Sequence, residues 1–456
     1  MKGLEKNVRK GRGISRRRFL ESAAGAGLVA IVPRHVLGGV GRTGANDRLN
    51  VAAVGIGGRG ADLLREIRDA ANVVALCDVD EKYAAKTFRR HRRARRYRDF
   101  RTMLERQKDI DAVIVATPDH THAVVTMMAL EMGKHVYCEK PLTHTVFEAR
   151  KIPEAAREAK VATQVGTQGH SSEDARLINQ WIWEGAIGPV REVHAWTDRP
   201  LKHDNWIEAT WRPKEKPRVP PKLDWDLWLG PAPRRPYHPS YLHGTRWRPW
   251  FDFGTGALGD LGSHHLDPVY WALGLGQCDS FSVEATSSKV YPETFPKASI
   301  VRYRFPARGD MPPVKITWYD GGLMPERPEE LKPDEQMPGN GVLFVGDKGK
   351  LLCDGWSRNP RLISESGVEA RKKAAEEPPS SCPHLQEWVE ACKTGRPTSA
   401  NFEYAGPLTE LILLGNVALR AARGLRLEWD RPAMKVANVP EANEYLHMDY
   451  RRGWTL

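Results

Sequence analysis

The chain is poor in the features that mark several common protein classes. Its 456 residues include only six cysteines, all single, with no C-x-x-C pair and no spacing typical of a metal site. No apolar run approaches the roughly 20 residues that a membrane span requires. We therefore expect no metal centre, no disulfide scaffold and no stable membrane insertion, although an oxidising compartment would permit a bridge between Cys382 and Cys392. The remaining composition, 41% hydrophobic and 28% charged, is typical of a globular protein with room for two domains.

The positive net charge of +12 is unevenly distributed along the chain. Residues 1–45 contain ten Lys and Arg residues against two acidic ones, so about +4 remains for everything that follows. One basic run persists, RRHRRARRYRDFR at 89–101, and it has few aromatic side chains on which bases could stack. We interpret this run as a solvated helix face and expect no nucleic-acid partner.

The N-terminus carries targeting features in a specific order. Basic residues lead into Ser15-Arg16-Arg17-Arg18-Phe19-Leu20, and a ten-residue apolar run rich in Ala and Gly then ends at Pro33. This order resembles a twin-arginine export signal, whose apolar region is weak, more than a plain basic tail. It predicts a periplasmic or otherwise exported protein that meets the twin-arginine export machinery and crosses the membrane already folded.

Apolar and amphipathic segments divide the rest of the chain into two α/β domains. Short apolar runs at 48–54, 72–77, 111–118, 135–141 and 160–166 alternate with helical patterns, which predicts a Rossmann-type doubly wound parallel sheet over residues 46–168. Residues 169–456 differ, because their strands are longer and alternate in polarity. This pattern predicts a second α/β domain with an open, mainly antiparallel sheet, a helix at 403–423 and a Pro- and Trp-rich insertion at 196–250.

A glycine motif follows the first predicted strand directly. It fits G-x-G-x-x-G and opens a helix, which is the context that dinucleotide binding requires. Asp78 ends the second strand, where a carboxylate binds the adenosine ribose and favours NAD over NADP. Arg89 and its neighbours could reach a 2′-phosphate, so NADP stays possible. The residues predicted to form this part of the site are Gly55, Gly57, Gly58, Arg59, Gly60 and Asp78.

Further candidates follow later strands, at the carboxyl edge where ligands bind in open α/β sheets. Thr117, Pro118 and His122 come after the strand at 111–118, with His122 either in the first turn of a helix or at the cofactor. Glu139 and Lys140 end the next strand, and Glu139 is assigned to the cofactor together with Thr117, Pro118 and His122. A lysine at this edge can hold a substrate hydroxyl and assist its deprotonation.

The segment GALGDLGSHHLD at 256–267 supplies a second group of polar residues. Asp260 and His264 are four residues apart, so a helix would place them on one face. A histidine is suited to general-base chemistry near neutral pH. His265 points elsewhere and is expected to pack, and two adjacent histidines without a further clustered ligand predict no zinc site.

The chain resembles the Gfo/Idh/MocA oxidoreductases, specifically an exported bacterial branch. The resemblance rests on the order and spacing of five motifs, GIGGRG, CDVD, ATPDHTHA, CEKP and GALGDLGSHHLD. The resemblance implies tight NAD(P) binding, a sugar or polyol substrate and a homo-oligomer. It also implies that Lys140 orients the substrate, that His264 is the general base and that Asp260 contacts or orients the substrate. One stretch departs from the family pattern, because the last Rossmann strand is followed by GTQGHSS. We assign Gln168 to the cofactor and His170 to the substrate, although which of the two meets the nicotinamide or the substrate stays open.

The remaining substrate candidates are Asp267 and the tryptophans of the insertion. An aromatic face can bind the apolar face of a sugar ring, and Trp206, Trp211 and Trp250 flank the Asp260–His264 segment. The hypothesis is hydride transfer between a ring carbinol and NAD, with bound cofactor recycled internally because free NAD is scarce outside the cytoplasm. The alternatives are an NAD-dependent glycoside hydrolase or lyase acting through transient oxidation, and a catalytically silent sugar-binding protein.

Overall fold

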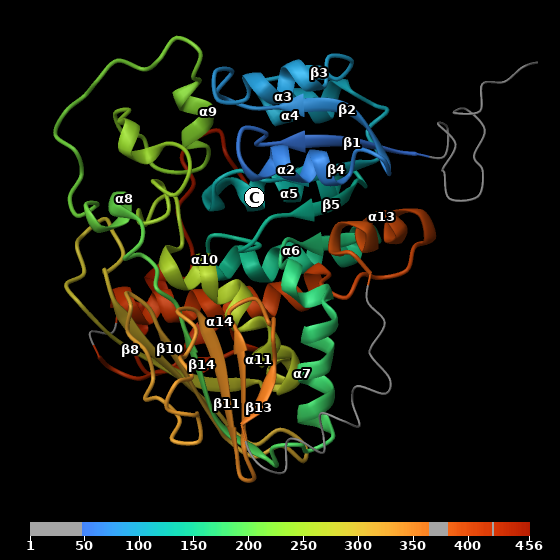
Figure 1. Ribbon diagram of the computed structural model, residues 1–456. Helices are drawn as coiled ribbons and strands as arrows, with labels where there is room; N and C mark the ends of the chain where they lie inside the picture. The colour runs from blue at the N-terminus through green and yellow to red at the C-terminus, as the bar shows by residue number, and fades with distance from the viewer. Residues whose placement is uncertain (1–47, 364–381, 422–423) are drawn as a thin grey trace, which may run out of the picture. The chain divides into compact units, whose positions relative to one another are not determined.

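The computed structural model describes residues 48–363, 382–421 and 424–456. Leu49–Leu456 forms one compact unit (Figure 1). The predicted export signal lies outside the described residues. Among the residues that the structure describes, no helix is long and apolar enough to cross a membrane. All six cysteines are described and each is unpaired, so Cys382 and Cys392 form no bridge.

The N-terminal part is a doubly wound parallel sheet, as predicted. The strand order is β3-β2-β1-β4-β5-β6 and every pairing is parallel. Apolar runs such as AVIV in β4 are buried on both faces, as a sheet covered by helices on each side requires. The strands are β1 (Leu49–Val54), β2 (Ala71–Cys77), β3 (Arg95–Tyr97), β4 (Ala112–Val115), β5 (His135–Cys138) and β6 (Thr163–Val165). The helices are α2 (Arg59–Glu66), α3 (Ala85–Arg90), α4 (Phe100–Arg106), α5 (His122–Glu131) and α6 (Val146–Ala159).

The C-terminal part is built on an open sheet of nine strands in which only the β7–β10 pairing is parallel. The order is β13-β12-β11-β7-β10-β9-β8-β14-β15, which confirms the predicted mainly antiparallel sheet. The strands are β7 (Val190–Trp196), β8 (Ser280–Ser287), β9 (Ser299–Phe305), β10 (Val314–Tyr319), β11 (Gly341–Gly346), β12 (Lys350–Asp354), β13 (Arg361–Ile363), β14 (Leu427–Asp430) and β15 (Lys435–Val436).

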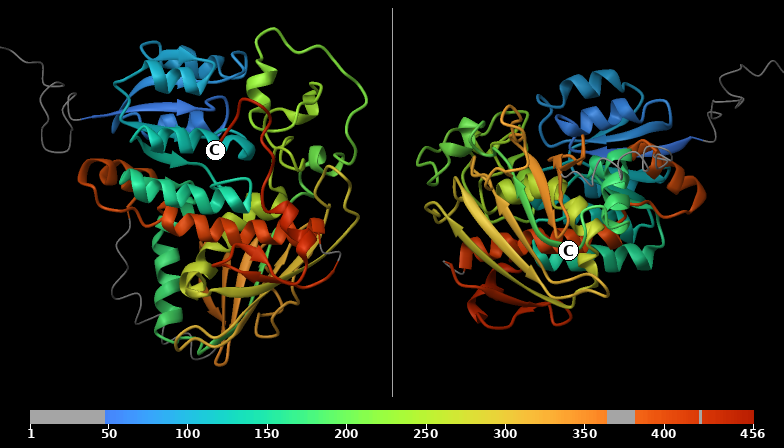
Figure 2. Two further views of the ribbon diagram at one scale, coloured as in Figure 1. Left: turned by 180° about the vertical axis from the view of Figure 1, so that it is seen from behind. Right: turned by 60° about the horizontal axis from the view of Figure 1, so that its bottom comes forward.

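Helices form a layer between the two sheets (Figures 1 and 2). Helix α14 (Phe402–Ala421) is buried along most of its length because it packs on α6 and α10 (Gly256–His265), and also on β8 and β9. Helix α11 (Asp267–Ala272) packs against α7 (Glu173–Trp183). This layer places α10, which carries Asp260 and His264, beside the Rossmann sheet.

The C-terminal segment returns to the Rossmann sheet. Helix α13 (His384–Thr394) contributes Leu385, Trp388 and Val389 to the core that packs against β1. Phe402, at the start of α14, is buried in the core on the opposite face of that sheet. The Rossmann core therefore includes side chains from α13 and α14, which lie beyond the predicted domain boundary at residue 168.

The Pro- and Trp-rich insertion has a small aromatic core of its own, with two short helices, α8 (Asp204–Ile207) and α9 (Trp225–Leu229). Two backbone hydrogen bonds join it to the loop after β2. The Glu81 N–H donates to the Lys222 carbonyl oxygen at 3.0 Å, and the Asp224 N–H donates to the Val79 carbonyl oxygen at 2.9 Å. The insertion therefore covers the carboxyl edge of the Rossmann sheet.

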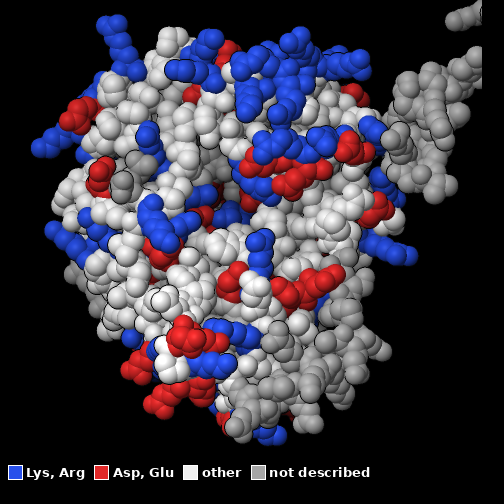
Figure 3. Space-filling model, in the orientation of Figure 1, with Lys and Arg blue, Asp and Glu red and all other residues white. Residues whose placement is uncertain are grey.

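The basic run at 89–101 is not a helix face, so that prediction is wrong. Helix α3 ends at Arg90, β3 pairs with Ala75–Cys77, and α4 begins at Phe100. Pairing with β2 satisfies the backbone of this edge strand and outweighs the helical propensity of arginine. The arginines of this run are exposed except for the part-buried Arg101, and Figure 3 shows Lys and Arg gathered over α3 and β3.

Candidate active site

A cavity of about 430 Å³ runs along the carboxyl edge of the Rossmann sheet. Residues that follow all six strands line it, together with side chains from the insertion, α10 and the C-terminal tail. β2 and β5 are three steps apart in the sheet, about 14 Å at the usual strand spacing. The cavity therefore has two separated ends, one at Asp78 and one at Lys140.

The glycine turn lies at the middle of this edge. Gly55 has a φ of +79°, and a Cβ there would lie 2.6 Å from the Ala116 carbonyl oxygen. A Cβ on Gly60 would lie 2.1 Å from the Gly55 carbonyl oxygen. Both positions therefore require glycine, and α2 begins at Arg59, so its N-terminus faces the cavity mouth. Gly55, Gly57, Gly58 and Arg59 line the cavity, while Gly60 is buried behind them.

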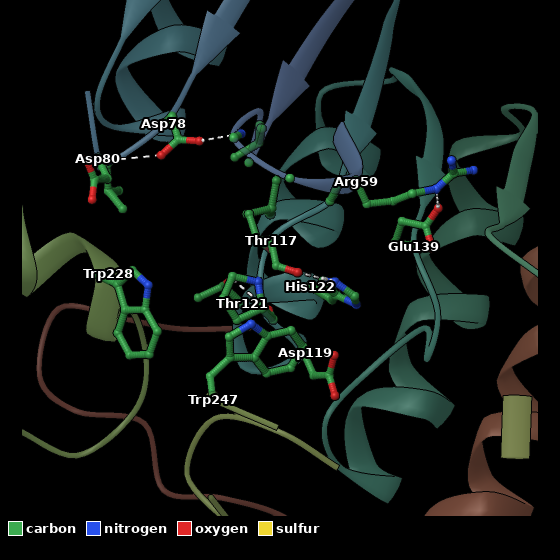
Figure 4. Close-up of a pocket in the computed structure, with 18 of the residues that line it drawn as sticks. Arg59, Asp78, Asp80, Thr117, Asp119, Thr121, His122, Glu139, Trp228 and Trp247 are labelled. Atoms are coloured by element: carbon green, nitrogen blue, oxygen red, sulfur yellow. Dashed lines mark hydrogen bonds and ion pairs between the residues drawn. The ribbon is translucent and has the colours of Figure 1, made fainter. Parts of the chain in front are cut away.

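Asp78 fixes the glycine turn from the neighbouring strand (Figure 4). Its Oδ2 accepts hydrogen bonds from the N–H groups of Ile56 and Gly57 at 2.8 and 3.1 Å. Its Oδ1 accepts one from the Asp80 N–H at 2.9 Å. Burial raises the pKa of Asp78 to about 6 against the opposing effect of these bonds. The carboxylate is thus held at the cavity wall, where the sequence predicts the adenosine ribose.

Three predicted cofactor residues meet at the other end of the sheet. Glu139 Oε1 accepts hydrogen bonds from Arg59 Nε at 3.0 Å and from Gln168 Nε2 at 3.2 Å. Burial alone would lower the pKa of Arg59, but Glu139 raises it above its ordinary value. Gln168 lines the cavity, so the GTQGHSS stretch presents its glutamine rather than its histidine.

His122 joins two loops at the cavity floor. Its Nδ1 lies 2.7 Å from the Pro141 carbonyl oxygen and its Nε2 2.9 Å from that of Thr117. Burial disfavours the imidazolium, but Cys138 and the Pro141 carbonyl help to raise the pKa of His122 to about 10. His122 therefore positions Thr117 and the loop that carries Lys140. Pro118 and Thr117 also line the cavity.

Lys140 is anchored to α10. Its Nζ donates to Asp260 Oδ1 at 2.6 Å and to the Asp260 carbonyl oxygen at 2.7 Å. Arg248 Nη1 lies 3.3 Å from the same carboxylate oxygen. Burial would raise the pKa of Asp260, but Arg248 and Lys140 hold it well below the usual range. Asp260 therefore stays ionised and orients Lys140, which lines the cavity.

His264 lies one helical turn beyond Asp260 and also lines the cavity. Its Nδ1 is buried without a hydrogen-bond partner among the described residues. Burial and the nearby Lys140 lower the pKa of His264 well below its ordinary value, so the ring is neutral at pH 7 and can accept a proton. His265 is buried against Trp318 and Trp356, which agrees with the expected packing role.

The predicted substrate residues His170, Trp206 and Asp267 do not line the cavity. His170 Nδ1 lies 2.9 Å from Asp267 Oδ1, and both side chains are 1% exposed. The hydroxyl of Tyr404 donates to the same carboxylate at 2.8 Å. This buried group ties α11 to α14 and to the turn after β6.

The tryptophans at the cavity differ from those that the sequence singles out. Trp206 and Trp250 are buried in the insertion, and Trp211 is 59% exposed. The cavity is lined instead by Trp228, Trp247 and Trp454. Trp228 and Trp247 lie across the cavity from the glycine turn (Figure 4). Their sequence signal is weak, because both lie in the aromatic-rich insertion that precedes α10.

Tyr83, His243 and Arg248 are further cavity residues that sequence reasoning missed. The Tyr83 ring stacks on His243 at 3.8 Å and lies so close to Gly57 that a Cβ there would be 2.0 Å from it. His243 Nε2 also lies 3.0 Å from Asp80 Oδ2. These contacts join residues distant in sequence, so no local pattern predicts them.

The residues present fit a dinucleotide. The turn excludes side chains at Gly55 and Gly60, and Thr117 Oγ1 and His264 Nδ1 are buried polar atoms without partners among the described residues. Within the described ranges, no group of three or more His, Cys, Asp or Glu side chains could hold a metal ion.

Family comparisons agree with this arrangement. Residues 49–167 match the Gfo/Idh/MocA model described as "Oxidoreductase family, NAD-binding Rossmann fold", and residues 195–309 match its "C-terminal alpha/beta domain". Together the two matches span just over half of the chain. The chain belongs to the Gfo/Idh/MocA oxidoreductase family. Residues 49–167 are therefore an NAD-binding Rossmann domain.

Individual members of the family are similar in sequence to parts of this chain. Levoglucosan dehydrogenase from Pseudarthrobacter phenanthrenivorans is 26% identical over 218 residues, which are 48% of this chain and 46% of that protein. The chain thus matches less than half the length of this curated relative.

Solved structures share the fold over most of the chain. The WlbA dehydrogenase from Chromobacterium violaceum, in complex with NADH and UDP-GlcNAcA, is 17% identical with a TM-score of 0.59, covering 85% of this chain and 98% of that one. An aldose-aldose oxidoreductase from Caulobacter crescentus, complexed with glycerol, is 16% identical with a TM-score of 0.56, covering 84% and 100%.

Proposed function

We propose that this protein is an NAD-dependent oxidoreductase that acts on a ring carbinol of a sugar or polyol. The observation that carries the proposal is the placement of Lys140 and His264 on one wall of the cavity, at the opposite end from Asp78. A dinucleotide bound along the sheet edge would place its reactive ring near these two side chains. The family match and the name of the levoglucosan dehydrogenase relative support a sugar-like substrate.

The residues divide the work between binding and proton transfer. NAD, when bound, supplies the hydride acceptor at the nicotinamide ring. Lys140 donates a hydrogen bond to the substrate hydroxyl from a position fixed by Asp260. His264, neutral at pH 7, accepts the hydroxyl proton. Trp228 and Trp247, from the insertion, form the wall of the cavity across from the glycine turn.

We further propose that the cofactor is loaded before export and returns to its starting redox state in each cycle. The twin-arginine-like order at the N-terminus supports export of a folded protein, and little free NAD is expected outside the cytoplasm. In such a cycle one sugar would be oxidised and a second sugar would then be reduced in the same cavity, so that no net redox change remains.

A second function is a glycoside hydrolase or lyase that oxidises a ring carbon only transiently. The resulting ketone would acidify the neighbouring C–H, the glycosidic group would be eliminated, and the ketone would be reduced at the end. The same Lys140 and His264 would serve the oxidation. A catalytically silent sugar-binding protein is disfavoured, because Lys140, Asp260 and His264 are all present and held together.

The test is turnover without added cofactor. Protein purified from exporting cells is freed of unbound dinucleotide by gel filtration, its bound NAD(H) is measured, and conversion of sugar pairs and glycosides is followed. We expect bound NAD(H) and turnover by the wild type, and bound NAD(H) with turnover lowered roughly 10²-fold or more by His264→Ala. Activity that requires added NAD in amounts stoichiometric with the product would refute internal recycling. Absence of NAD binding would refute the whole proposal.

A further inference from the structure

The last nine residues, 448–456, run from the C-terminal domain to the Rossmann domain (Figures 1 and 2). We call this segment the strap. Near its start, the Tyr450 hydroxyl donates a hydrogen bond to Glu148 in α6. Trp454, near its end, packs with Tyr450 and Leu456 against the core of the Rossmann domain. The strap is therefore a defined structural element.

Arg451 fastens the strap to the insertion. Its N–H donates to the Pro231 carbonyl oxygen at 3.1 Å, and its guanidinium donates to Asp226 Oδ1 at 2.7 Å and to the Gly230 carbonyl oxygen. The Arg451 side chain is only 9% exposed, although Asp226 is exposed. These bonds connect the strap to both ends of α9, which carries the cavity residue Trp228.

Trp454 is held in one orientation at the cavity wall. Its ring lies 6.0 Å from that of Phe100 and 4.5 Å from the Arg101 guanidinium carbon. Arg101 is itself fixed by Asp99, with Nη2 2.7 Å from Oδ2 and Nε 3.0 Å from Oδ1. Trp454 and Phe100 both line the cavity. The indole therefore forms part of the cavity's surface, and its position depends on the rest of the strap.

The sheet order identifies the end of the cavity at which Trp454 lies. Phe100 follows β3, which is the edge strand beside β2, and β2 leads to Asp78. Lys140 and His264 lie at the β5 end. Trp454 thus lines the end where Asp78 is suited to the adenosine ribose, away from the reacting groups. An aromatic face in such a place can contact a base, and a base–aromatic contact contributes a substantial share of nucleotide binding.

We propose that the strap covers the adenosine end of the cavity and slows release of the dinucleotide, with Trp454 as the side chain in contact with it. This inference rests on the proposed function, because it requires NAD(H) in the cavity. It assigns cofactor retention to residues outside both the Rossmann domain and the catalytic group. A dinucleotide can then leave only after the strap detaches from α9 or Trp454 turns away.

The test measures the dissociation rate of NADH rather than activity. Full-length protein is loaded with NADH, mixed with excess NAD, and followed by the loss of bound NADH fluorescence. Trp454→Ala should release NADH roughly tenfold faster or more, with Trp454→Phe between it and the wild type. Arg451→Gln keeps the indole but loosens the strap and should also accelerate release. Trp183→Ala, at an exposed tryptophan on α7, is the matched control and should stay within about twofold of the wild type.

The outcomes separate the strap from the proposed function. The proposal for the strap would be wrong if the wild type binds NADH but Trp454→Ala, Trp454→Phe and Arg451→Gln all release it at the control rate. That result would leave the proposed function standing. A wild type that binds no dinucleotide would overturn both. Should Trp454→Ala fail to fold, as judged by thermal unfolding, the two milder variants decide the question by their release rates.

Discussion

Replacement of Lys140 by Met tests the catalytic assignment directly. Methionine keeps much of the length and apolar surface of the side chain but removes the ammonium that donates to Asp260 and, in the proposed reaction, to the substrate hydroxyl. We expect turnover to fall while NADH binding at the Asp78 end is preserved, because the two ends of the cavity are three strand spacings apart.

The size of the effect can be worked from the contacts of Asp260. At 2.6 Å and an effective dielectric constant of about 20, the Lys140–Asp260 attraction is roughly 6 kcal/mol, and that of Arg248 at 3.3 Å is roughly 5 kcal/mol. Desolvation of the charges offsets much of both values. Asp260 therefore keeps one cation after the substitution and stays ionised, so the protein should fold. The catalytic loss should be about 10²- to 10⁴-fold, the usual contribution of a proton-transfer group.

The assay combines turnover with a titration. kcat/KM is measured with protein that carries stoichiometric cofactor, and the pKa of His264 is followed by NMR. Because the charge of Lys140 lowers the pKa of His264, that pKa should rise in Lys140→Met. Lys151→Met removes an exposed ion pair on α6 and is the control. A folded Lys140→Met protein with kcat/KM within threefold of the wild type, and an unshifted His264, would refute the reasoning.

Three further predictions concern the cofactor and the base. Because the pKa of Asp78 is raised to about 6, its carboxylate loses its charge as the pH falls through 6. The affinity for NAD should therefore weaken over that pH range in a fluorescence titration, and Asp78→Asn should abolish this pH dependence. Asp78→Ala should weaken NAD binding more than NADP binding. His264→Ala should retain bound cofactor and lower turnover by roughly 10²-fold or more in a single-turnover assay. Gly60→Ala should reduce thermal stability and dinucleotide binding together, since its Cβ would lie 2.1 Å from the Gly55 carbonyl oxygen; unchanged values of both would contradict the close approach.

Much of the fold could be predicted because its signals are local. Apolar runs that alternate with helical patterns indicate a parallel sheet whatever lies elsewhere, and β1 to β6 occur where those patterns place them, apart from the edge strand β3. β3 was missed because arginine favours a helix locally and only pairing with β2 makes RRY a strand. The return of α13 to the Rossmann core could not be predicted either, since contacts across some 300 residues leave no periodic signal.

The candidate site divides in the same way. Gly55, Asp78, Lys140 and His264 follow strands or share a helix face, so their place at the cavity follows from short motifs. The residues that surround them come from the insertion and the C-terminus, and their positions depend on tertiary packing. The sequence places His170 and Asp267 at the substrate, whereas in the structure their side chains pair with each other and do not line the cavity.

The return of the C-terminal segment to the Rossmann sheet has a consequence for the order in which the protein matures on the ribosome. Leu385, Trp388 and Phe402 complete cores on the two faces of that sheet, yet they are translated long after its last strand, β6. Domains normally fold as units during synthesis, beginning at the N-terminus. Here the nascent nucleotide-binding domain lacks part of both walls until α13 and the start of α14 have been translated, so a chain that stops before them should be held by chaperones or degraded instead of acquiring its dinucleotide.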